Sequence, residues 1–153
     1  GVLLELSHEI DYIQWLLGPL KIHYAQLRNS SELNLEVEEI ADLVLTTNRG
    51  VVCNIHLDFL QKNAIRTCSF VGNKGRIDWN LLANKIQLHT KEKEQCLFFE
   101  TNSDSNKMYL ELIKNFLNLI SGRPNSCVDL EQATGTIELI DNIKKISLQG
   151  VKQ

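Results

Sequence analysis

The residues best suited to chemistry lie near the start of the chain, where Glu5, His8 and Asp11 stand three positions apart. At this spacing side chains project from one side of a helix, within reach of one small ligand. Histidine titrates near neutrality, and an adjacent carboxylate fixes its tautomer and stabilises its charged form. The arrangement suits proton transfer to a sugar or alcohol hydroxyl. Tyr12 and Trp15 fall on the same polar face.

Two other interpretations of these residues stay open. Charged pairs at this spacing are commonly ordinary surface pairs, each contributing roughly 0.2–0.5 kcal/mol to the helix. A metal site built from His8 and Asp11 is the second alternative, but only two or three ligands are visible and no second cluster complements them. His23 and His89, in presumed strands, receive no role.

The segment that positions these residues is predicted to be a helix over residues 2–17, ended by Gly18 and Pro19. Glycine supplies the left-handed residue that ends a helix, and proline cannot continue the hydrogen-bond ladder. At helical periodicity the apolar residues fall within one arc, which must face the core. They are Val2, Leu3, Leu6, Ile10, Ile13 and Leu17.

Between residues 20 and 100 the pattern is typical of short strands joined by tight turns. The clearest turns, at residues 48–50 and 72–75, predict hairpins, and hairpins require antiparallel neighbours. In residues 51–60 apolar side chains alternate with Asn54, His56 and Asp58. This polar face is predicted to be an interface or to face solvent. Residues 85–89 and 95–99 form a last predicted hairpin.

Two predicted helices close the chain, at residues 105–121 and 129–149. The first carries a methionine and aromatic stripe that we expect to be buried core. The second has Asp129 as N-cap and Gln132 at the capping-box position. Its expected buried stripe is Leu130, Ala133, Ile137, Ile140 and Ile143 or Lys144. The order of elements predicts an α+β domain with helices packed on one face of an open, mainly antiparallel sheet.

The length, composition and charge of the sequence limit the classes of protein to which it can belong. With 153 residues and 43% hydrophobic content, the chain is expected to form one soluble domain. Its net charge of −3, with scattered basic residues, argues against nucleic acid as a partner. No apolar run reaches the ~18 residues of a membrane span, and no signal-type segment opens the chain, so a cytoplasmic protein is expected. The four cysteines lie far apart and are expected to be reduced thiols: Cys53, Cys68, Cys96 and Cys127.

Residues 1–18, GVLLELSHEIDYIQWLLG, resemble an active-site signature: glycine, an acidic residue, His-x-Ile-Asp, and a Trp-Leu-x-Gly helix end. The signature is that of the glucose-fructose oxidoreductase, inositol dehydrogenase and rhizopine-catabolism (Gfo/Idh/MocA) family. Residues 56–61 (HLDFLQ) and 70–79 (FVGNKGRIDW) are similar to the family's sheet strands. The resemblance covers nearly the whole chain.

The resemblance implies a parent enzyme of two domains, an NAD(P)-dependent oxidoreductase acting on CH–OH groups. An N-terminal Rossmann domain would hold NAD or NADP, and a dihydrodipicolinate-reductase-like C-terminal domain would supply substrate contacts and the oligomer interface. Residues 1–153 match only the second domain, and the common phosphate-binding glycine motifs are absent from them. We therefore expect this chain alone to bind no cofactor and to be inactive.

The family's site residues carry over to three positions of this sequence. His8 falls on the catalytic histidine that relays a proton as hydride moves, and Asp11 falls on a substrate-contacting aspartate. Glu5 stands nearest the catalytic-site aspartate, but it is a glutamate and precedes His8 by three positions where many members have four. Tyr12, beside Asp11, is expected to contact the substrate. No metal-binding residue is predicted.

The resemblance further implies a sugar, sugar nucleotide or other polyol as substrate. It also implies a homodimer or tetramer formed through the open sheet face that carries Asn54, His56 and Asp58. The alternative is a non-catalytic binding or scaffold domain that keeps the fold.

Overall fold

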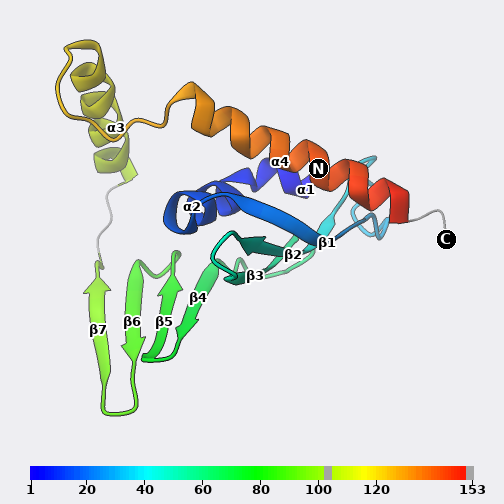
Figure 1. Ribbon diagram of the computed structural model, residues 1–153, viewed down its shortest axis with the longest axis horizontal. Coiled ribbons are helices and arrows are strands. Elements are labelled where there is room, and N and C mark those ends of the chain that lie inside the picture. The colour runs from blue at the N-terminus through cyan, green and yellow to red at the C-terminus, as the bar shows by residue number, and fades with distance from the viewer. Residues whose placement is uncertain (102–104, 151–153) are drawn as a thin grey trace. The chain divides into compact units, whose positions relative to one another are not determined.

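Helices stand at both ends of the sequence and strands lie between them in the computed structural model, which describes residues 1–101 and 105–150 (Figure 1). The α+β class predicted from the sequence is confirmed. The elements are α1 (Val2–Glu5), α2 (Ser7–Leu17), β1 (Leu20–Arg28), β2 (Ile40–Thr47), β3 (Val52–Asp58), β4 (Thr67–Gly72), β5 (Gly75–Asn80), β6 (Lys85–His89), β7 (Glu94–Phe99), α3 (Ser105–Ile120) and α4 (Leu130–Gly150).

The strands pair into two antiparallel sheets, whereas the sequence suggested one. One sheet has the order β1-β2-β3 and the other the order β4-β5-β6-β7. The chain leaves the first sheet at Asp58, whose Oδ1 accepts hydrogen bonds from the backbone N–H groups of Leu60 and Gln61 at 2.8 and 2.9 Å. These bonds form a turn that takes the two N–H groups away from strand pairing.

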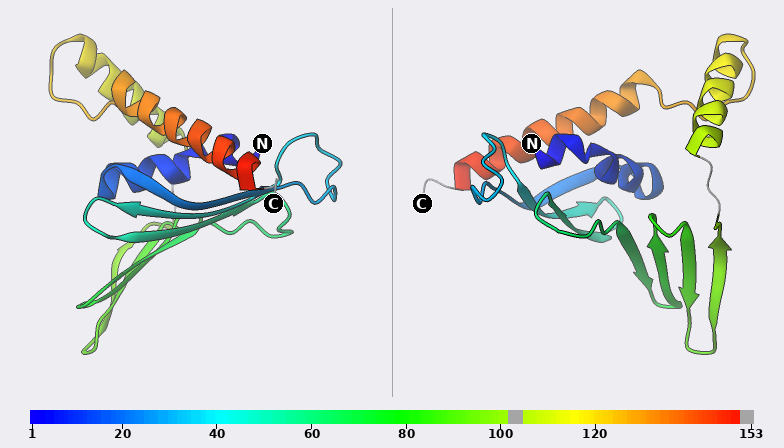
Figure 2. Two further views of the ribbon diagram at one scale, coloured as in Figure 1. Left: turned by 45° about the vertical axis from the view of Figure 1, so that its right-hand side comes forward. Right: turned by 180° about the vertical axis from the view of Figure 1, so that it is seen from behind.

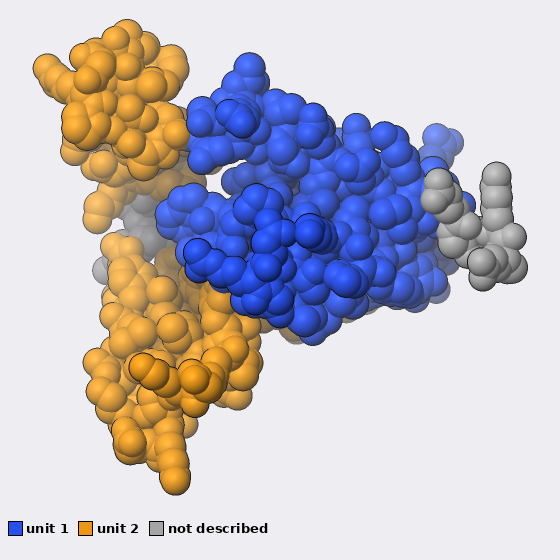
Figure 3. Space-filling model, viewed as in Figure 1, with its two compact units in different colours: residues 1–61, 128–153 blue, residues 62–127 orange. Residues whose placement is uncertain are grey.

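The two sheets belong to two compact units (Figure 3). The first unit comprises residues 1–61 and 128–153, and the second comprises residues 62–127. The residues predicted to do chemistry all belong to the first unit: Glu5 lies on α1, and His8, Asp11 and Tyr12 lie on α2.

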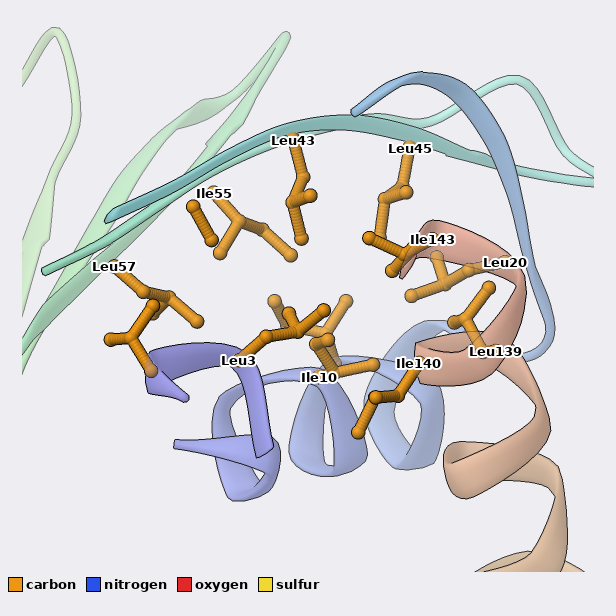
Figure 4. Close-up of a cluster of buried hydrophobic side chains, with 13 residues drawn as sticks. Leu3, Ile10, Leu20, Leu43, Leu45, Ile55, Leu57, Leu139, Ile140 and Ile143 are labelled. Carbon is orange, nitrogen blue, oxygen red and sulfur yellow. The ribbon is translucent and has the colours of Figure 1, made fainter. Parts of the chain in front are cut away.

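In the first unit, α1, α2 and α4 pack on one face of the β1–β3 sheet (Figure 2). Strand β2 shows why: Ala41, Leu43 and Leu45 are buried while the intervening Asp42 and Val44 are only partly covered, as strand alternation requires. In Figure 4, Leu43 and Leu45 of β2 point toward the helices. The core cluster consists of Val2, Leu3, Ile10, Ile13, Leu20, Ala41, Leu43, Leu45, Ile55, Leu57, Leu139, Ile140 and Ile143.

The helix predicted over residues 2–17 is interrupted once. Leu6, with φ −101° and ψ 26°, separates α1 from α2. Its side chain still packs against the core, so the predicted apolar arc holds across the interruption. The predicted stop is confirmed, because Gly18 has φ +87° and its N–H bonds the carbonyl of Gln14 at 2.8 Å.

Helix α4 begins as predicted, with a capping box. Asp129 Oδ1 accepts from the Gln132 N–H at 2.8 Å, and Gln132 Oε1 accepts from the Asp129 N–H at 3.3 Å. Its expected buried stripe is confirmed at Ile140 and Ile143, but it is wrong at Leu130 and Ile137, which are 82% and 47% exposed. The buried residues are Thr136, Leu139, Ile140, Ile143 and Ser147.

In the second unit, β4 to β7 form successive hairpins. The predicted turn at residues 72–75 is confirmed, with Gly72 paired to Gly75. Gly75 has φ +150°, and a Cβ there would lie 2.3 Å from the carbonyl oxygen of His89, so only glycine fits. The stripe on α3 that was expected to be core is exposed among the described residues, for example Met108 at 62% and Phe116 at 54%.

Candidate functional site

His8 lies on the surface of α2, with 48% of its side chain exposed. Its Nε2 is 3.1 Å from Oε1 of Glu9, whose side chain is only 11% exposed. A half-exposed imidazole can reach a ligand while a buried carboxylate holds its ring in place. The sequence did not single out Glu9, because adjacent residues on a helix do not normally face each other.

Glu5 stands apart from this pair. It is exposed and is the last residue of α1, so the interruption at Leu6 separates it from His8. The geometry that supported the pairing of Glu5 with His8, three residues apart on one regular helix, is therefore not present. Within the described ranges no hydrogen bond or ion pair joins the two side chains.

Asp11 lies one turn after His8 on the same continuous helix, and its carboxylate is tied to α4. Its Oδ1 accepts a hydrogen bond of 2.9 Å from the hydroxyl of Thr136. The same hydroxyl oxygen accepts a bond of 2.9 Å from Nε2 of Gln14. Thr136 is 5% exposed, whereas Asp11 is partly exposed. No local sequence pattern could reveal this contact, which joins residues 125 positions apart.

Tyr12 and Trp15, the aromatic residues of the predicted polar face, differ in their surroundings. Tyr12 is partly buried and packs against the core of the first unit. Trp15 is 77% exposed. Since α2 has 3.6 residues per turn, Trp15 follows His8 by almost two full turns and lies on the same side of the helix. The structure therefore presents His8 and Trp15 together, with Tyr12 set closer to the core.

A second polar cluster crosses the open face of the β1–β3 sheet. His56 Nδ1 is 2.6 Å from Asp42 Oδ1, and its Nε2 is 3.2 Å from Asp58 Oδ2. Arg28 Nη2 bonds the other oxygen of Asp42 at 2.6 Å. Only a doubly protonated ring can donate hydrogen bonds at both of its nitrogens. The strand register, which sets Asp42 opposite His56, creates this cluster, and the sequence had identified only His56 and Asp58.

The electrostatics agree with that geometry. The hydrogen bond to Asp42 raises the pKa of His56 above the usual histidine value, and the same bond holds the pKa of Asp42 low. Burial opposes ionisation of Asp58, but hydrogen bonds from Gln61 and Leu60 outweigh it and lower the pKa of that carboxyl. With half of its side chain exposed, His56 fits the predicted solvent-facing or interface position.

Three structural features bear on metal, membrane and dinucleotide binding by the described residues. Within residues 1–101 and 105–150, no three His, Cys, Asp or Glu side chains gather closely enough to hold a metal ion. No helix in these ranges is long and apolar enough to cross a membrane. All the strand pairs are antiparallel in these same ranges, whereas a dinucleotide-binding unit needs a parallel strand–helix–strand crossover.

Solved structures with the same fold come from several oxidoreductases. They include an oxidoreductase from Thermotoga maritima (20% identity, TM-score 0.74, covering 94% of this chain and 43% of that one). They also include the 3-ketoreductase KijD10 from Actinomadura kijaniata in complex with TDP-benzene and NADP (20% identity, TM-score 0.70, covering 92% of this chain and 45% of that one). A third is the UDP-N-acetylglucosamine 3-dehydrogenase GnnA from Acidithiobacillus ferrooxidans (16% identity, TM-score 0.68, covering 93% of this chain and 44% of that one).

The chain spans less than half the length of each of these structures. No curated protein matches its sequence. The family model described as "Oxidoreductase family, C-terminal alpha/beta domain" matches residues 1–152. This match and the shared fold confirm the resemblance drawn from residues 1–18, and the chain belongs to the Gfo/Idh/MocA oxidoreductase family, whose C-terminal domain it matches.

Proposed function

We propose that residues 1–153 are the substrate-binding and oligomerisation domain of a longer NAD(P)-dependent oxidoreductase whose N-terminal Rossmann domain lies outside this sequence. The observation that carries the proposal is the placement of His8: it is half exposed on α2, paired with the buried Glu9, and one turn from Asp11. The family match over residues 1–152 supports it. So does the length of the structural neighbours, which are more than twice as long.

The substrate we propose is a sugar, a sugar nucleotide or a related polyol, oxidised at a CH–OH group or formed by the reverse reduction. The names of two neighbours support this class, one a 3-ketoreductase solved with a TDP compound and NADP, the other a UDP-N-acetylglucosamine 3-dehydrogenase.

In the proposed reaction His8 takes the proton from the substrate hydroxyl during oxidation and returns it during reduction. Glu9 orients the imidazole, Asp11 binds a neighbouring hydroxyl, and Tyr12 closes the side of the site next to the core. Glu5 remains a candidate for a catalytic contact from the end of α1. A nicotinamide cofactor, when bound, would supply or accept the hydride. We assign that cofactor to the proposed Rossmann domain, and the antiparallel pairing of the described strands supports this, since dinucleotide-binding units use parallel strands.

We also propose that two copies pair through the open face of the β1–β3 sheet, giving a homodimer or tetramer. This face carries Tyr24 and Val52, which are 49% and 58% exposed, around the Asp42–His56 cluster. An antiparallel sheet covered by helices on one face leaves the other face exposed, and apolar side chains grouped among polar ones on such a face mark an interaction surface. Sedimentation of the chain should show a dimer at tens of micromolar concentration, whereas a monomer at that concentration would contradict the pairing.

The test of the catalytic proposal uses the longer protein. Purified with NADP⁺ or NADPH, it should interconvert the hydroxyl and ketone of at least one UDP- or TDP-linked sugar, with nicotinamide absorbance as the signal. The present chain alone should show no turnover. If the longer protein neither binds a nicotinamide cofactor nor turns over any sugar nucleotide, the non-catalytic alternative becomes the better account.

A further inference from the structure

We propose that Thr136 on α4 is a positioning residue for Asp11, and that Gln14 completes the arrangement. The inference rests on the proposed function, which assigns Asp11 to substrate binding. It extends the site from α2, where the sequence placed it, to a residue on the last helix that no sequence motif identifies.

The chemistry of the three groups fixes the direction of the hydrogen bonds. An ionised carboxylate only accepts, and a hydroxyl has one hydrogen to donate. Thr136 therefore donates to Asp11 Oδ1 at 2.9 Å, and its oxygen must accept at 2.9 Å from the Gln14 amide, whose nitrogen only donates. The result is a directed chain from Gln14 through Thr136 to Asp11.

The burial of Thr136 makes this chain an effective anchor. Its 5% exposure shields the hydroxyl from water, and it precedes Leu139 and Ile140, which are core residues of α4. A threonine in a helix has two preferred χ1 rotamers, and the bonds of the Thr136 hydroxyl to Gln14 and Asp11 hold it in one of them. Hydrogen bonds to a charged acceptor are stronger than those between neutral groups. With Oδ1 held in this way, the direction of Oδ2 is set as well.

The anchor acts on the geometry between Asp11 and His8. Both lie on one continuous helix, so the backbone fixes their spacing, but an aspartate side chain can still rotate. A carboxylate held in a single rotamer binds a substrate hydroxyl without first losing rotational entropy. Loss of the anchor should therefore weaken substrate binding more than it slows the chemical step, which depends on His8.

The test compares four variants of the longer enzyme. Thr136→Val keeps the shape of the side chain but removes the hydroxyl, and Thr136→Ser keeps the hydroxyl. Gln14→Met removes the donor to Thr136. Thr134→Val is the matched control on the same helix, since the Thr134 hydroxyl is exposed and bonds the carbonyl of Leu130 in its own helix.

We expect Thr136→Val to raise the substrate KM about fivefold to tenfold, the usual effect of one lost hydrogen bond, with kcat within about threefold of wild type. Thr136→Ser keeps the hydroxyl and should have the wild-type substrate KM. Gln14→Met should raise this KM by about twofold to threefold. The control Thr134→Val should leave it unchanged. The KM for NADP should not change in any of them. If Thr136→Val fails to fold, Gln14→Met and Thr136→Ser decide the question.

Asp11→Ala separates a failure of this inference from a failure of the proposed function. If Asp11→Ala raises the substrate KM while Thr136→Val and Gln14→Met leave it at the wild-type value, the positioning role is wrong and the proposed function stands. An unchanged KM in Asp11→Ala would overturn the positioning role of Thr136 together with the assignment of Asp11 to substrate binding. The proposed function itself fails only if the longer protein turns over no sugar nucleotide.

Discussion

The strands of the two sheets have similar patterns of apolar and polar residues, but the two sheets differ in how far their apolar side chains are buried. In the β1–β3 sheet, Leu43, Leu45, Ile55 and Leu57 are buried under the helices. In the second unit no described residue between positions 62 and 127 is buried. The same alternation of apolar and polar residues therefore leads to a packed layer in one unit and to partly exposed strands in the other.

The register of the second sheet makes the contrast sharper. Phe70, Ile77 and Leu88 are paired across β4, β5 and β6, as are Cys68, Trp79 and Ile86, so one face of this sheet is apolar. The apolar side chains of α3 are also exposed among the described residues. An alternating pattern identifies a face that can be buried, but only the tertiary partners of that face decide whether it is. The candidate site lies in the first unit, where helices pack on the apolar face of the sheet.

The largest expected effect is on the core of the first unit. Leu45→Ala should lower the free energy of unfolding by about 2–5 kcal/mol, because Leu45 is fully buried and the truncation leaves a cavity. Leu88→Ala is the matched change in the second sheet and should cost less than about 1.5 kcal/mol, since Leu88 is only partly buried. Urea unfolding followed by circular dichroism measures both. Equal costs in the two sheets would contradict the contrast.

Hydrogen exchange sharpens the comparison strand by strand. The amides of β2, central in the covered sheet, should exchange at least about tenfold more slowly than those of β5 and β6, because local opening is easiest where few apolar contacts are broken. Mass spectrometry of peptides from 40–47 and 75–89 gives the two rates for the same sample. Slower exchange in the second unit would mean that its sheet is the more stable one.

The smallest effect concerns the open face of the first sheet. The pKa of His56 is raised in the folded chain, so its contribution to stability is fully present below the ordinary pKa of 6.5 and is lost as the pH rises through the raised value. His56→Gln should therefore lower the melting temperature most below pH 6.5, and the difference should shrink as the pH rises.

His23→Gln is the control for this measurement, because the ring of His23 bonds the hydroxyl of Thr46 on the same sheet. The partner of His23 is a neutral hydroxyl where His56 has two carboxylates, so the melting-temperature difference should vary less with pH for His23→Gln than for His56→Gln. A constant difference for His56→Gln would show that Asp42 and Asp58 do not hold the imidazole in its charged form.

Local signals predicted much of the fold. Gly18 ended α2, Asp129 and Gln132 capped α4, and the turns around Gly50 and Gly75 defined hairpins, because each depends on residues a few positions apart. The family signature likewise located the candidate site on the first helical segment. These features needed no knowledge of the tertiary structure.

The remainder depends on contacts that no short pattern encodes. The side chain of Thr136 meets Asp11 across 125 positions, and Asp42 joins His56 only through the register of β2 and β3. The interruption at Leu6 changes the relation of Glu5 to His8 although the apolar periodicity continues across it. The exposed stripe of α3 was expected to be buried because periodicity indicates a face and carries no information about its partner.

The most direct test of this account is the turnover of His8→Asn in the longer enzyme. Removing a positioned acid/base typically costs about 10²- to 10⁴-fold in rate, so kcat should fall at least about 10²-fold. The affinity for NADP should stay close to wild type, since in the proposed function a separate Rossmann domain would hold the cofactor. If kcat remained within about threefold of wild type, far from the usual acid/base effect, His8 would be an ordinary surface residue of α2 and the proposed site would be wrong.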